Sequence, residues 1–175
     1  KRGFKPVQSP RLGAARTFKN SRLFPSLTVR DNVRVEFHLH LAHDAAHSLT
    51  RFRAFQLEEC EIDRQVGELL DIFQLGPHRD APAKSLPYGD QRRLEIARAL
   101  AAHPTLLILD EPAAGMNQVE AHRLSVLIRA LADDGVTVLL IEHNVRMVLE
   151  TCTRVVVLDF GEGIAAGDPG TVARD

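Results

Sequence analysis

LLILDEP, residues 106–112, is the stretch that decides the fold, because four apolar residues lead directly into two adjacent acids, Asp110 and Glu111. A short apolar run of this kind is expected of a buried parallel strand, whose carboxyl end opens into a ligand crevice. Two carboxylates there suit a metal-bound phosphate, with Asp110 near Mg²⁺ and Glu111 near an attacking water. The competing interpretation is a strand followed by an acidic turn that Pro112 closes. The rest of the chain favours the first.

Two further apolar runs, at residues 136–141 and 155–158, follow the first one. Helical stretches at residues 118–132 and 144–151 separate the three runs. Strands that alternate with helices in this way predict a parallel sheet. The chain from about residue 102 onward is therefore expected to form an α/β core.

The middle of the chain has a helical pattern instead of an alternating one. Thr28 followed by Asp31 resembles a capped helix start. Between residues 57 and 75, apolar side chains recur at helical spacing, namely Ile62, Val66, Leu69, Leu70 and Phe73. A third helix is expected after the turn at Gly89, with Leu94, Ile96, Ala97 and Leu100 on its apolar side. These patterns predict a helical subdomain.

The chain is thus predicted to have three parts. Residues 1–19 would end an amino-terminal part of the core, residues 20–101 would form an α-helical subdomain, and residues 102–175 would form the remaining α/β core. The composition is that of an ordinary globular protein, with 45% hydrophobic and 26% charged residues and a formal net charge of −1. No apolar run approaches the roughly 20 residues of a membrane-spanning helix, and no signal-peptide pattern opens the chain. Membrane association is expected only through a partner.

Basic residues are concentrated near the start of the chain. Eight of the 22 Lys and Arg residues precede Asp31, which is the first acidic residue. A basic arm could bind nucleic acid, but this one lacks interleaved aromatic residues for base stacking. We therefore expect no nucleic-acid partner.

Other motifs surround LLILDEP in a distinctive order. ARTFKN at 15–20 and LPYGDQRRLEIARAL at 86–100 precede it, while AAGMN at 113–117 and LLIEH at 139–143 follow it. A turn at a helix start, an acidic strand end and a strand that ends in histidine occur in this order in ATP-binding cassette proteins. The chain resembles that superfamily and, within it, the ATPase subunits of branched-chain amino acid importers. LPYG, where general cassette ATPases carry LSGGQ, and AAGMN are the more specific parts.

The resemblance implies a P-loop NTPase-type fold, here a partial parallel-sheet core with an α-helical subdomain, and ATP and Mg²⁺ as ligands. Catalysis would rest on placing a water in line and neutralising charge on the γ-phosphate. Glu111 is expected to be the base that polarises the water, and Asp110 to support Mg²⁺ through water. His143 matches the family's switch histidine and would hydrogen-bond the γ-phosphate. The alternative interpretation is that His143 is a polar residue at a strand end without a functional role.

The LPYGDQ motif is expected to bind ATP through a different mechanism. A helix start offers free amide donors and a positive dipole end to an anion. By resemblance it would reach the ATP of the opposite subunit, through Leu86, Pro87, Tyr88, Gly89, Asp90 and Gln91. Gly89 would allow a close backbone approach, whereas Pro87 replaces the serine that supplies a hydroxyl in general cassettes. A purely structural helix cap is the alternative.

Two residues depart from the general pattern of the family. Asn117, in the loop that crosses the dimer, stands where aspartate is common, and its amide can still hydrogen-bond but carries no charge. Lys19 stands where the family has a glutamine that senses Mg²⁺ and water. A lysine ammonium cannot ligate a cation, although it could attract a phosphate oxygen. The chain either couples nucleotide to transport differently or is a divergent or decaying copy.

A cassette ATPase also requires a phosphate-binding loop of the form G-x-x-x-x-G-K-[ST]. The sequence contains no such motif and begins at Lys1 without an initiator methionine. By resemblance, the loop should precede ARTF by a few tens of residues. We therefore expect an amino-terminally truncated piece that is inactive by itself.

The leading hypothesis is an ATP-hydrolysing energy subunit of a membrane importer, cytoplasmic and peripheral on the inner face of the plasma membrane. It would form a homodimer or a heterodimer with a second ABC ATPase, contact transmembrane permease subunits near residues 19–25, and serve a periplasmic solute-binding protein indirectly. Only the resemblance points to branched-chain amino acids. The alternatives are a truncated or degenerate non-catalytic module and a soluble cassette ATPase, for which a coiled coil or tandem cassettes would be expected.

Histidines and cysteines were considered as metal ligands. Four histidines lie in HLHLAHDAAH, residues 38–47, and His43 and His47 are one helical turn apart, a spacing that could hold a metal. We favour a solvated helix face, because the segment lies in the helical subdomain, away from the inferred nucleotide site. Cys60 and Cys152 lack metal-ligand spacing and are expected to be reduced thiols.

Overall fold

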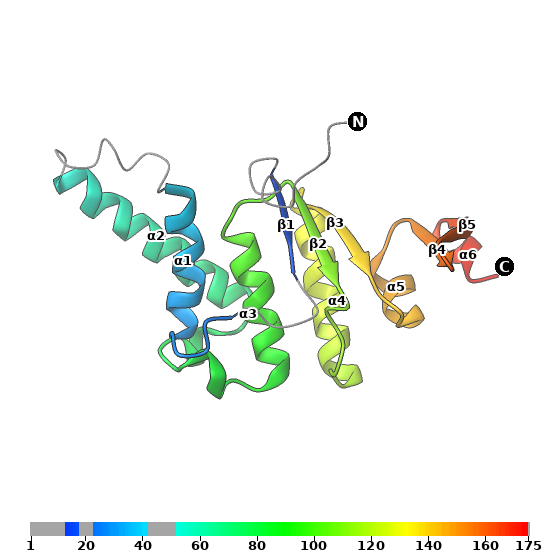
Figure 1. Cartoon of the computed structure of the whole chain (residues 1–175), viewed down its shortest axis with the longest axis horizontal. Helices are drawn as coiled ribbons and strands as arrows, with labels where there is room; N and C mark the ends of the chain where they lie inside the picture. Colours follow the sequence, from blue (N-terminus) through cyan, green and yellow to red (C-terminus); the bar gives the residue numbers. More distant parts are fainter. Residues whose placement is uncertain (1–12, 18–22, 42–51, 175) are drawn as a thin grey trace.

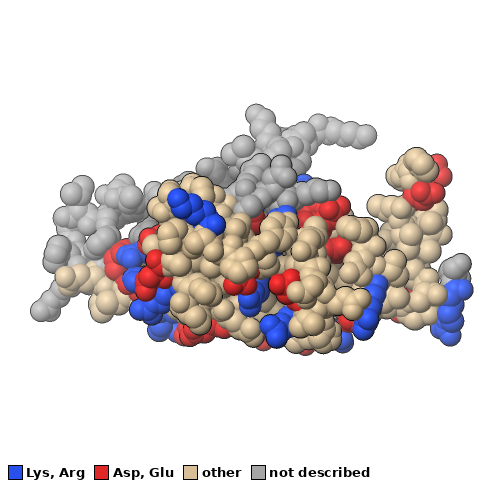
Figure 2. All heavy atoms as spheres, turned by 90° about the horizontal axis from the view of Figure 1, so that it is seen from below, with Lys and Arg blue, Asp and Glu red and all other residues tan. Residues whose placement is uncertain are grey.

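The fold is that of a computed structural model, which describes residues 13–17, 23–41 and 52–174. Helices form one end of the molecule, a parallel sheet with helical segments beside it forms the middle, and a small hairpin lies at the carboxyl end (Figure 1). On the face shown in Figure 2, acidic and basic side chains are interspersed over the helices and are not gathered into a patch of one sign.

The parallel sheet has its strands in the order β1 (Ala14–Arg16), β2 (Leu106–Asp110), β3 (Thr137–Ile141). The central strand β2 pairs with both neighbours. Leu107 and Leu109 are fully buried, as alternate residues on one side of β2. Helix α4 (Gln118–Asp133) connects β2 to β3 and adds buried Leu124 and Ile128 to the same core. The predicted parallel sheet is confirmed for these strands.

The apolar run at residues 155–158 does not join that sheet. It lies in β4 (Val155–Asp159), which follows helix α5 (Val145–Thr151) and pairs antiparallel with β5 (Glu162–Gly167) in a separate sheet. Phe160 and Gly161 connect the two strands with φ angles of 44° and 87°. Two consecutive positive φ angles define the type I′ turn, which folds a strand straight back on itself. The expectation of a third parallel strand here was therefore wrong.

The described residues of the helical end form three long helices and two short 3₁₀ turns. These are α1 (Val29–Leu41), α2 (Phe52–Ile72), η4 (Gly76–His78), η5 (Ala83–Ser85) and α3 (Tyr88–Leu100). The apolar residues predicted at helical spacing lie in its core, with Leu69 only partly buried. All described elements of this group fall within residues 20–101, but the boundaries of the three predicted parts stay predictions. In the described ranges, no helix combines the length and apolar character needed to cross a membrane.

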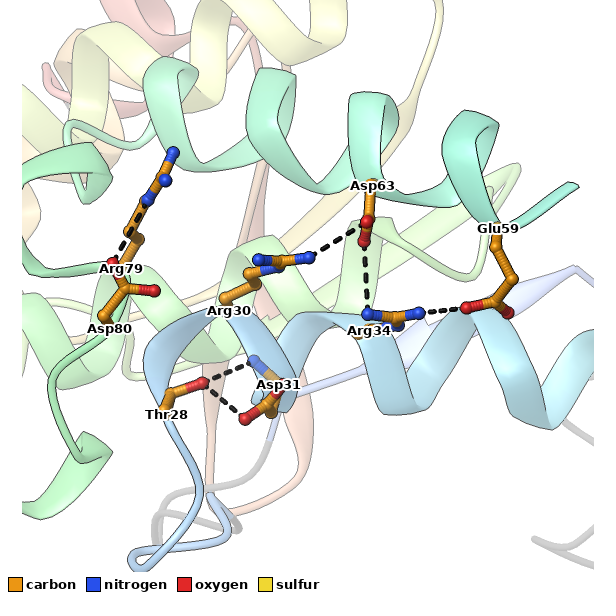
Figure 3. Close-up of polar contacts among 8 residues, drawn as sticks. All are labelled: Thr28, Arg30, Asp31, Arg34, Glu59, Asp63, Arg79 and Asp80. Carbon is orange, nitrogen blue, oxygen red and sulfur yellow. Dashed lines mark hydrogen bonds and ion pairs between the residues drawn. The ribbon is translucent and has the colours of Figure 1, made fainter. Parts of the chain in front are cut away.

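Thr28 caps α1 much as predicted. Its Oγ1 accepts the backbone N–H of Asp31 at 3.0 Å and donates its own hydrogen to Asp31 Oδ2 at 2.6 Å (Figure 3). The carboxylate therefore binds the hydroxyl of Thr28, whereas in a full capping box it would bind the backbone amide of that residue. The acid also lies in the first turn, where negative charge is favourable.

Ion pairs join α1 to α2 along their length (Figure 3). Arg30 Nη2 lies 2.9 Å from Asp63 Oδ2, Arg34 Nη1 lies 3.3 Å from Asp63 Oδ1, and Arg34 also pairs with Glu59. The hydrogen bond to Asp63 raises the pKa of Arg30. Because these side chains are partly exposed, the pairs contribute little energy each and mainly set how the helices lie against one another.

Asn32 in α1 is fully buried and holds the loop that enters the helix. Its Oδ1 accepts the Phe24 N–H at 2.8 Å, and its Nδ2 donates to the carbonyls of Phe24 at 3.0 Å and Thr28 at 2.9 Å. The side chain thereby gives the Phe24 N–H its acceptor and adds a second donor to the carbonyls of Phe24 and Thr28, which also accept backbone N–H groups. The sequence analysis did not single out this residue.

The two cysteines are free thiols, as predicted. Cys60 is exposed on α2, and Cys152 follows α5 in a partly buried position. Burial raises the pKa of the Cys152 thiol, which lowers its thiolate fraction at neutral pH.

Replacement of Asn32 by alanine is expected to lower the free energy of unfolding by about 2 kcal/mol, because the Phe24 N–H loses its acceptor and the Phe24 and Thr28 carbonyls each lose a donor. Urea unfolding followed by circular dichroism measures the change. Gln65→Ala is the matched control, since the Gln65 side chain donates to Glu61 at the surface of α2, and should shift stability by less than about 0.5 kcal/mol. Equal stability of the two variants would contradict the role of Asn32.

Candidate functional site

The carboxyl edge of the parallel sheet places two predicted site residues directly after β2. Asp110 is the last residue of the strand, and Glu111 follows it with a φ of 47°. The Glu111 N–H donates to the Ile141 carbonyl of β3 at 2.8 Å, so the hydrogen-bond ladder extends one residue past the strand. A positive φ is uncommon for a residue other than glycine. It turns the chain out of the sheet at the point where the second acid stands.

His143 lies at the same edge, two residues after the end of β3. Its Nδ1 is 3.8 Å from Glu111 Oε1, which is too long for a hydrogen bond. The imidazole is 75% exposed and the Glu111 side chain 26% exposed. The structure thus brings the two predicted catalytic residues together in a position that solvent reaches.

Asp110 is paired with Arg16 at the end of β1. Arg16 Nη2 lies 2.9 Å from Asp110 Oδ2, and both side chains are partly exposed. Among the described residues, no group of three or more His, Cys, Asp or Glu side chains is arranged to hold a metal. One carboxylate at a strand end fits Mg²⁺ that is held mainly by phosphate oxygens and water, but does not fit a cage of protein ligands. Arg16 was not predicted as a site residue. The one feature of the sequence that pointed to it is its place in the ARTF motif.

Glu142 is a further residue that the sequence analysis missed. Its side chain is only 1% exposed. Its Oε1 accepts the Ala113 N–H at 3.0 Å, and its Oε2 accepts the N–H groups of His143 at 3.1 Å and Asn144 at 3.3 Å. Asn144 in turn caps α5 by accepting the Met147 N–H at 3.2 Å. A buried carboxylate therefore links the loop after β2 to the loop after β3.

The LPYGDQ motif forms the start of α3. Pro87 is the N-cap and its side chain makes no capping hydrogen bond, while Tyr88 and Gly89 begin the helix. Their N–H groups belong to the first turn, where no carbonyl of the same helix is available. Leu86 and Gly89 are buried, whereas Pro87 and Tyr88 are exposed and Asp90 and Gln91 are partly exposed. The exposed helix start can offer amides to an anion.

Tyr88 also connects this motif to the AAGMN loop. Arg92 donates from Nε at 2.9 Å and from Nη2 at 2.7 Å to Tyr88 Oη, and its Nη1 pairs with Glu95 at 2.8 Å. Burial lowers the pKa of Arg92, but hydrogen bonds to Glu95 and Tyr88 outweigh it and raise the pKa overall. Gly115 has a φ of 77°, and a Cβ there would lie 3.0 Å from Tyr88 Cε1. The two motifs are thus packed together within one chain.

Asn117 is the N-cap of α4. Its side chain accepts the N–H groups of Val119 and Glu120, each at 3.0 Å, and Glu120 Oε2 accepts the Asn117 N–H at 2.9 Å. This is a full capping box, which the spacing of Asn117 and Glu120 could have revealed. A Cβ on Gly89 would lie 3.2 Å from Glu120 Oε1. The proposed contact of Asn117 across an interface stays a prediction.

Several predicted residues cannot be placed in this site. Lys19, His43 and His47 lie outside the described residues. The backbone at His38 and His40 is part of helix α1. The predictions made for these residues stay predictions.

A parallel sheet that presents adjacent acids and a histidine at its carboxyl edge, beside the start of a helix, defines a nucleotide-binding α/β protein. The sequence profile described as ABC transporter matches residues 2–114. The chain belongs to the ABC transporter family.

Curated relatives agree with the predicted subfamily. The high-affinity branched-chain amino acid transport ATP-binding protein BraF of Pseudomonas aeruginosa is 40% identical over 91% of this chain and 63% of its own length. The corresponding protein LivG of Escherichia coli K12 is 38% identical over 99% of this chain and 68% of its own length. The chain therefore spans about two thirds of these relatives. The lipopolysaccharide export system ATP-binding protein LptB of the same strain is 40% identical over only 63% of the chain.

Solved structures agree with the fold. A structure described as an ATP-binding cassette of an ABC transporter has a TM-score of 0.78 and 25% identity, and the match covers 98% of this chain and 68% of that one. CbiO1 of Clostridium perfringens, described as part of an ABC transporter complex, has a TM-score of 0.76 and 25% identity over 94% of this chain and 61% of that one. The expected partial cassette core with helices beside it is confirmed.

Gly115→Ala is expected to destabilise the chain by about 1–3 kcal/mol, because alanine resists the positive φ and its Cβ would press on Tyr88. Gly135→Ala is the matched control, since Gly135 has a φ of 94° but no atom within 4 Å of an added Cβ. Urea unfolding of both variants separates the two contributions. An equal loss in both would show that the contact with Tyr88 costs nothing.

Proposed function

We propose that the protein is an ATP-hydrolysing energy subunit of a membrane importer for branched-chain amino acids. The observation that carries the proposal is the meeting of Asp110, Glu111 and His143 at one edge of the parallel sheet. The relatives named for branched-chain amino acid transport match nearly the whole chain and support the cargo class.

Each of the three residues has a distinct part in hydrolysis. Glu111 would orient and deprotonate the attacking water, and His143, whose Nδ1 lies 3.8 Å from Glu111 Oε1, would hydrogen-bond the γ-phosphate. Asp110 would hold Mg²⁺ through water, in exchange for its pairing with Arg16. When bound, Mg²⁺ would neutralise charge that develops on the phosphates.

The second half of the ATP site would come from another subunit. The first-turn amides of α3, at Tyr88 and Gly89, suit the phosphates of an ATP molecule on the opposite chain. The Leu86 to Gln91 motif and Asn117 would then form the facing surface of a homodimer or of a heterodimer with a second ABC ATPase. Lys19 would attract a phosphate oxygen where the family uses glutamine.

The helical part would transmit closure of the dimer to transmembrane permease subunits. Asn32 fixes the loop of residues 23–28, which overlaps the segment of residues 19–25 expected to contact the permease. This arrangement implies a cytoplasmic protein, peripheral on the inner face of the plasma membrane. A periplasmic solute-binding protein would be served only indirectly.

A non-catalytic cassette module is the second candidate function. The 175 residues contain no G-x-x-x-x-G-K-[ST] loop, and Lys19 replaces the family's glutamine. Without the amides and lysine of that loop, the β- and γ-phosphates lose most of their ligands. On their own, these residues should bind ATP weakly and not hydrolyse it. Clear turnover by the purified 175-residue chain would refute this expectation.

In a gene product that contains the phosphate-binding loop, Glu111→Gln is expected to lower kcat for ATP hydrolysis by about 100- to 10,000-fold, because the general base is lost. Phosphate release assays measure kcat, and binding of a fluorescent nucleotide should persist. Glu36→Gln is the control, since Glu36 pairs with Arg98 at 3.2 Å in the helical part. Unchanged turnover in the Glu111 variant would rule out Glu111 as the general base.

The cargo is tested by uptake of labelled leucine in cells that carry the protein with its permease and binding protein. Excess isoleucine or valine should compete with uptake, and Glu111→Gln should abolish it, because transport requires hydrolysis. Uptake that ignores these competitors, or export of a lipid as the name of LptB describes, would reject the branched-chain cargo.

A further inference from the structure

We propose that Glu142 is a positioning residue for hydrolysis, which fixes the spacing between the base Glu111 and the γ-phosphate sensor His143. The inference rests on the proposed function, because the spacing matters only if Glu111 and His143 take part in hydrolysis. Its evidence is a buried carboxylate that binds three backbone N–H groups from two loops of the site.

Two bonds tie the loop after β2 to the chain leaving β3. The first joins Glu111 N–H to the Ile141 carbonyl at 2.8 Å, and the second joins Ala113 N–H to Glu142 Oε1 at 3.0 Å. Glu111 thus lies between a strand end and an anchored loop. Without the second bond, the loop would be held to β3 at Glu111 alone, next to a residue of positive φ.

The other carboxylate oxygen holds the loop that carries His143. Glu142 Oε2 accepts the N–H groups of His143 and Asn144, and Asn144 then caps α5. The hydrogen bond fixes the backbone of His143. Its imidazole remains exposed, so the ring can reach a ligand. One side chain therefore sets the position of both loops, and hence the 3.8 Å separation of Glu111 Oε1 from His143 Nδ1.

Only a glutamate fulfils this role. All three partners of its side chain are N–H donors, so both oxygens must act as acceptors, as in a carboxylate. Glutamine has the same size, but its NH₂ group is a donor. It would face a backbone N–H group, which is also a donor. Aspartate is one methylene shorter and cannot reach both loops at once. Leaving the carboxylate buried without partners would be costly, so the loops are held where the carboxylate needs them.

The first experiment compares Glu142→Gln with wild type in a gene product that contains the phosphate-binding loop. Misplacement of Glu111 relative to the γ-phosphate should lower kcat for ATP about 10- to 100-fold. KM for ATP should change less than about threefold, because the nucleotide-holding amides are untouched. Glu36→Gln, which removes a carboxylate charge away from the site, should leave both constants unchanged. A purely structural role predicts instead that kcat stays at the wild-type value per folded molecule.

A double variant tests whether Glu142 acts through His143. In a His143→Ala background, Glu142→Gln should lower kcat by much less than in wild type, since one of the two positioned groups is already gone. Fully multiplicative effects would show that the two residues act independently and would overturn the proposal.

Amide exchange in the wild-type 175-residue chain tests the geometry without any variant. The Ala113 and Asn144 N–H groups should exchange slowly in NMR spectra, although neither bonds a backbone carbonyl in a helix or strand. Rapid exchange at both would overturn the proposal. If the wild type hydrolyses ATP and Glu142→Gln does so with the same kcat, the inference about Glu142 is rejected and the proposed function is not. Absence of wild-type hydrolysis would reject the proposed function, and the exchange rates would then decide whether Glu142 holds the two loops.

Discussion

The in-register pairing of β2 with β3 is the constraint on which the rest of the structure depends. Asp110 lies opposite Ile141, so the residues that follow both strands leave the sheet at one edge. Because side chains alternate along a strand, a slip of one residue would turn the buried Leu107 and Leu109 outward. The same slip would move Glu111 away from His143. Burial of the apolar face and assembly of the site are thus secured by one set of hydrogen bonds.

A second contact joins the helical part to this edge. Tyr88 at the start of α3 packs where Gly115 has no side chain, and Gly89 lies against the Glu120 carboxylate that caps α4. The buried Arg92 binds the Tyr88 hydroxyl and resists movement of the ring relative to the helix. A displacement of α3 would therefore also displace the loop after Glu111. Motifs that are distant in the sequence form one mechanical unit.

Local pattern predicted much of this arrangement and missed what depends on tertiary contacts. The periodicity of apolar residues identified β2, β3, α2 and α3, because burial of one face leaves a trace within a single segment. The hairpin of β4 and β5 was missed because Phe160 gives no sign that it will adopt a positive φ. Arg16 and Glu142 look like ordinary charged residues in the sequence, since Asp110 and Ala113, which they bind across the fold, are distant in the chain. The Asn117 cap was visible in its spacing to Glu120 and was overlooked.

Three neighbouring carboxylates at the edge illustrate how surroundings assign roles to one chemical group. Asp110 faces a guanidinium, which suits the proposed exchange of this cation for Mg²⁺. Glu142 is buried and accepts three backbone N–H groups, with the His143 imidazole 3.9 Å away, which makes it a fixed anchor. Glu111 is partly exposed and faces an imidazole, so it combines access to water with a neighbour that can bear a proton. Sequence order alone would not separate these roles, whereas exposure and partners do.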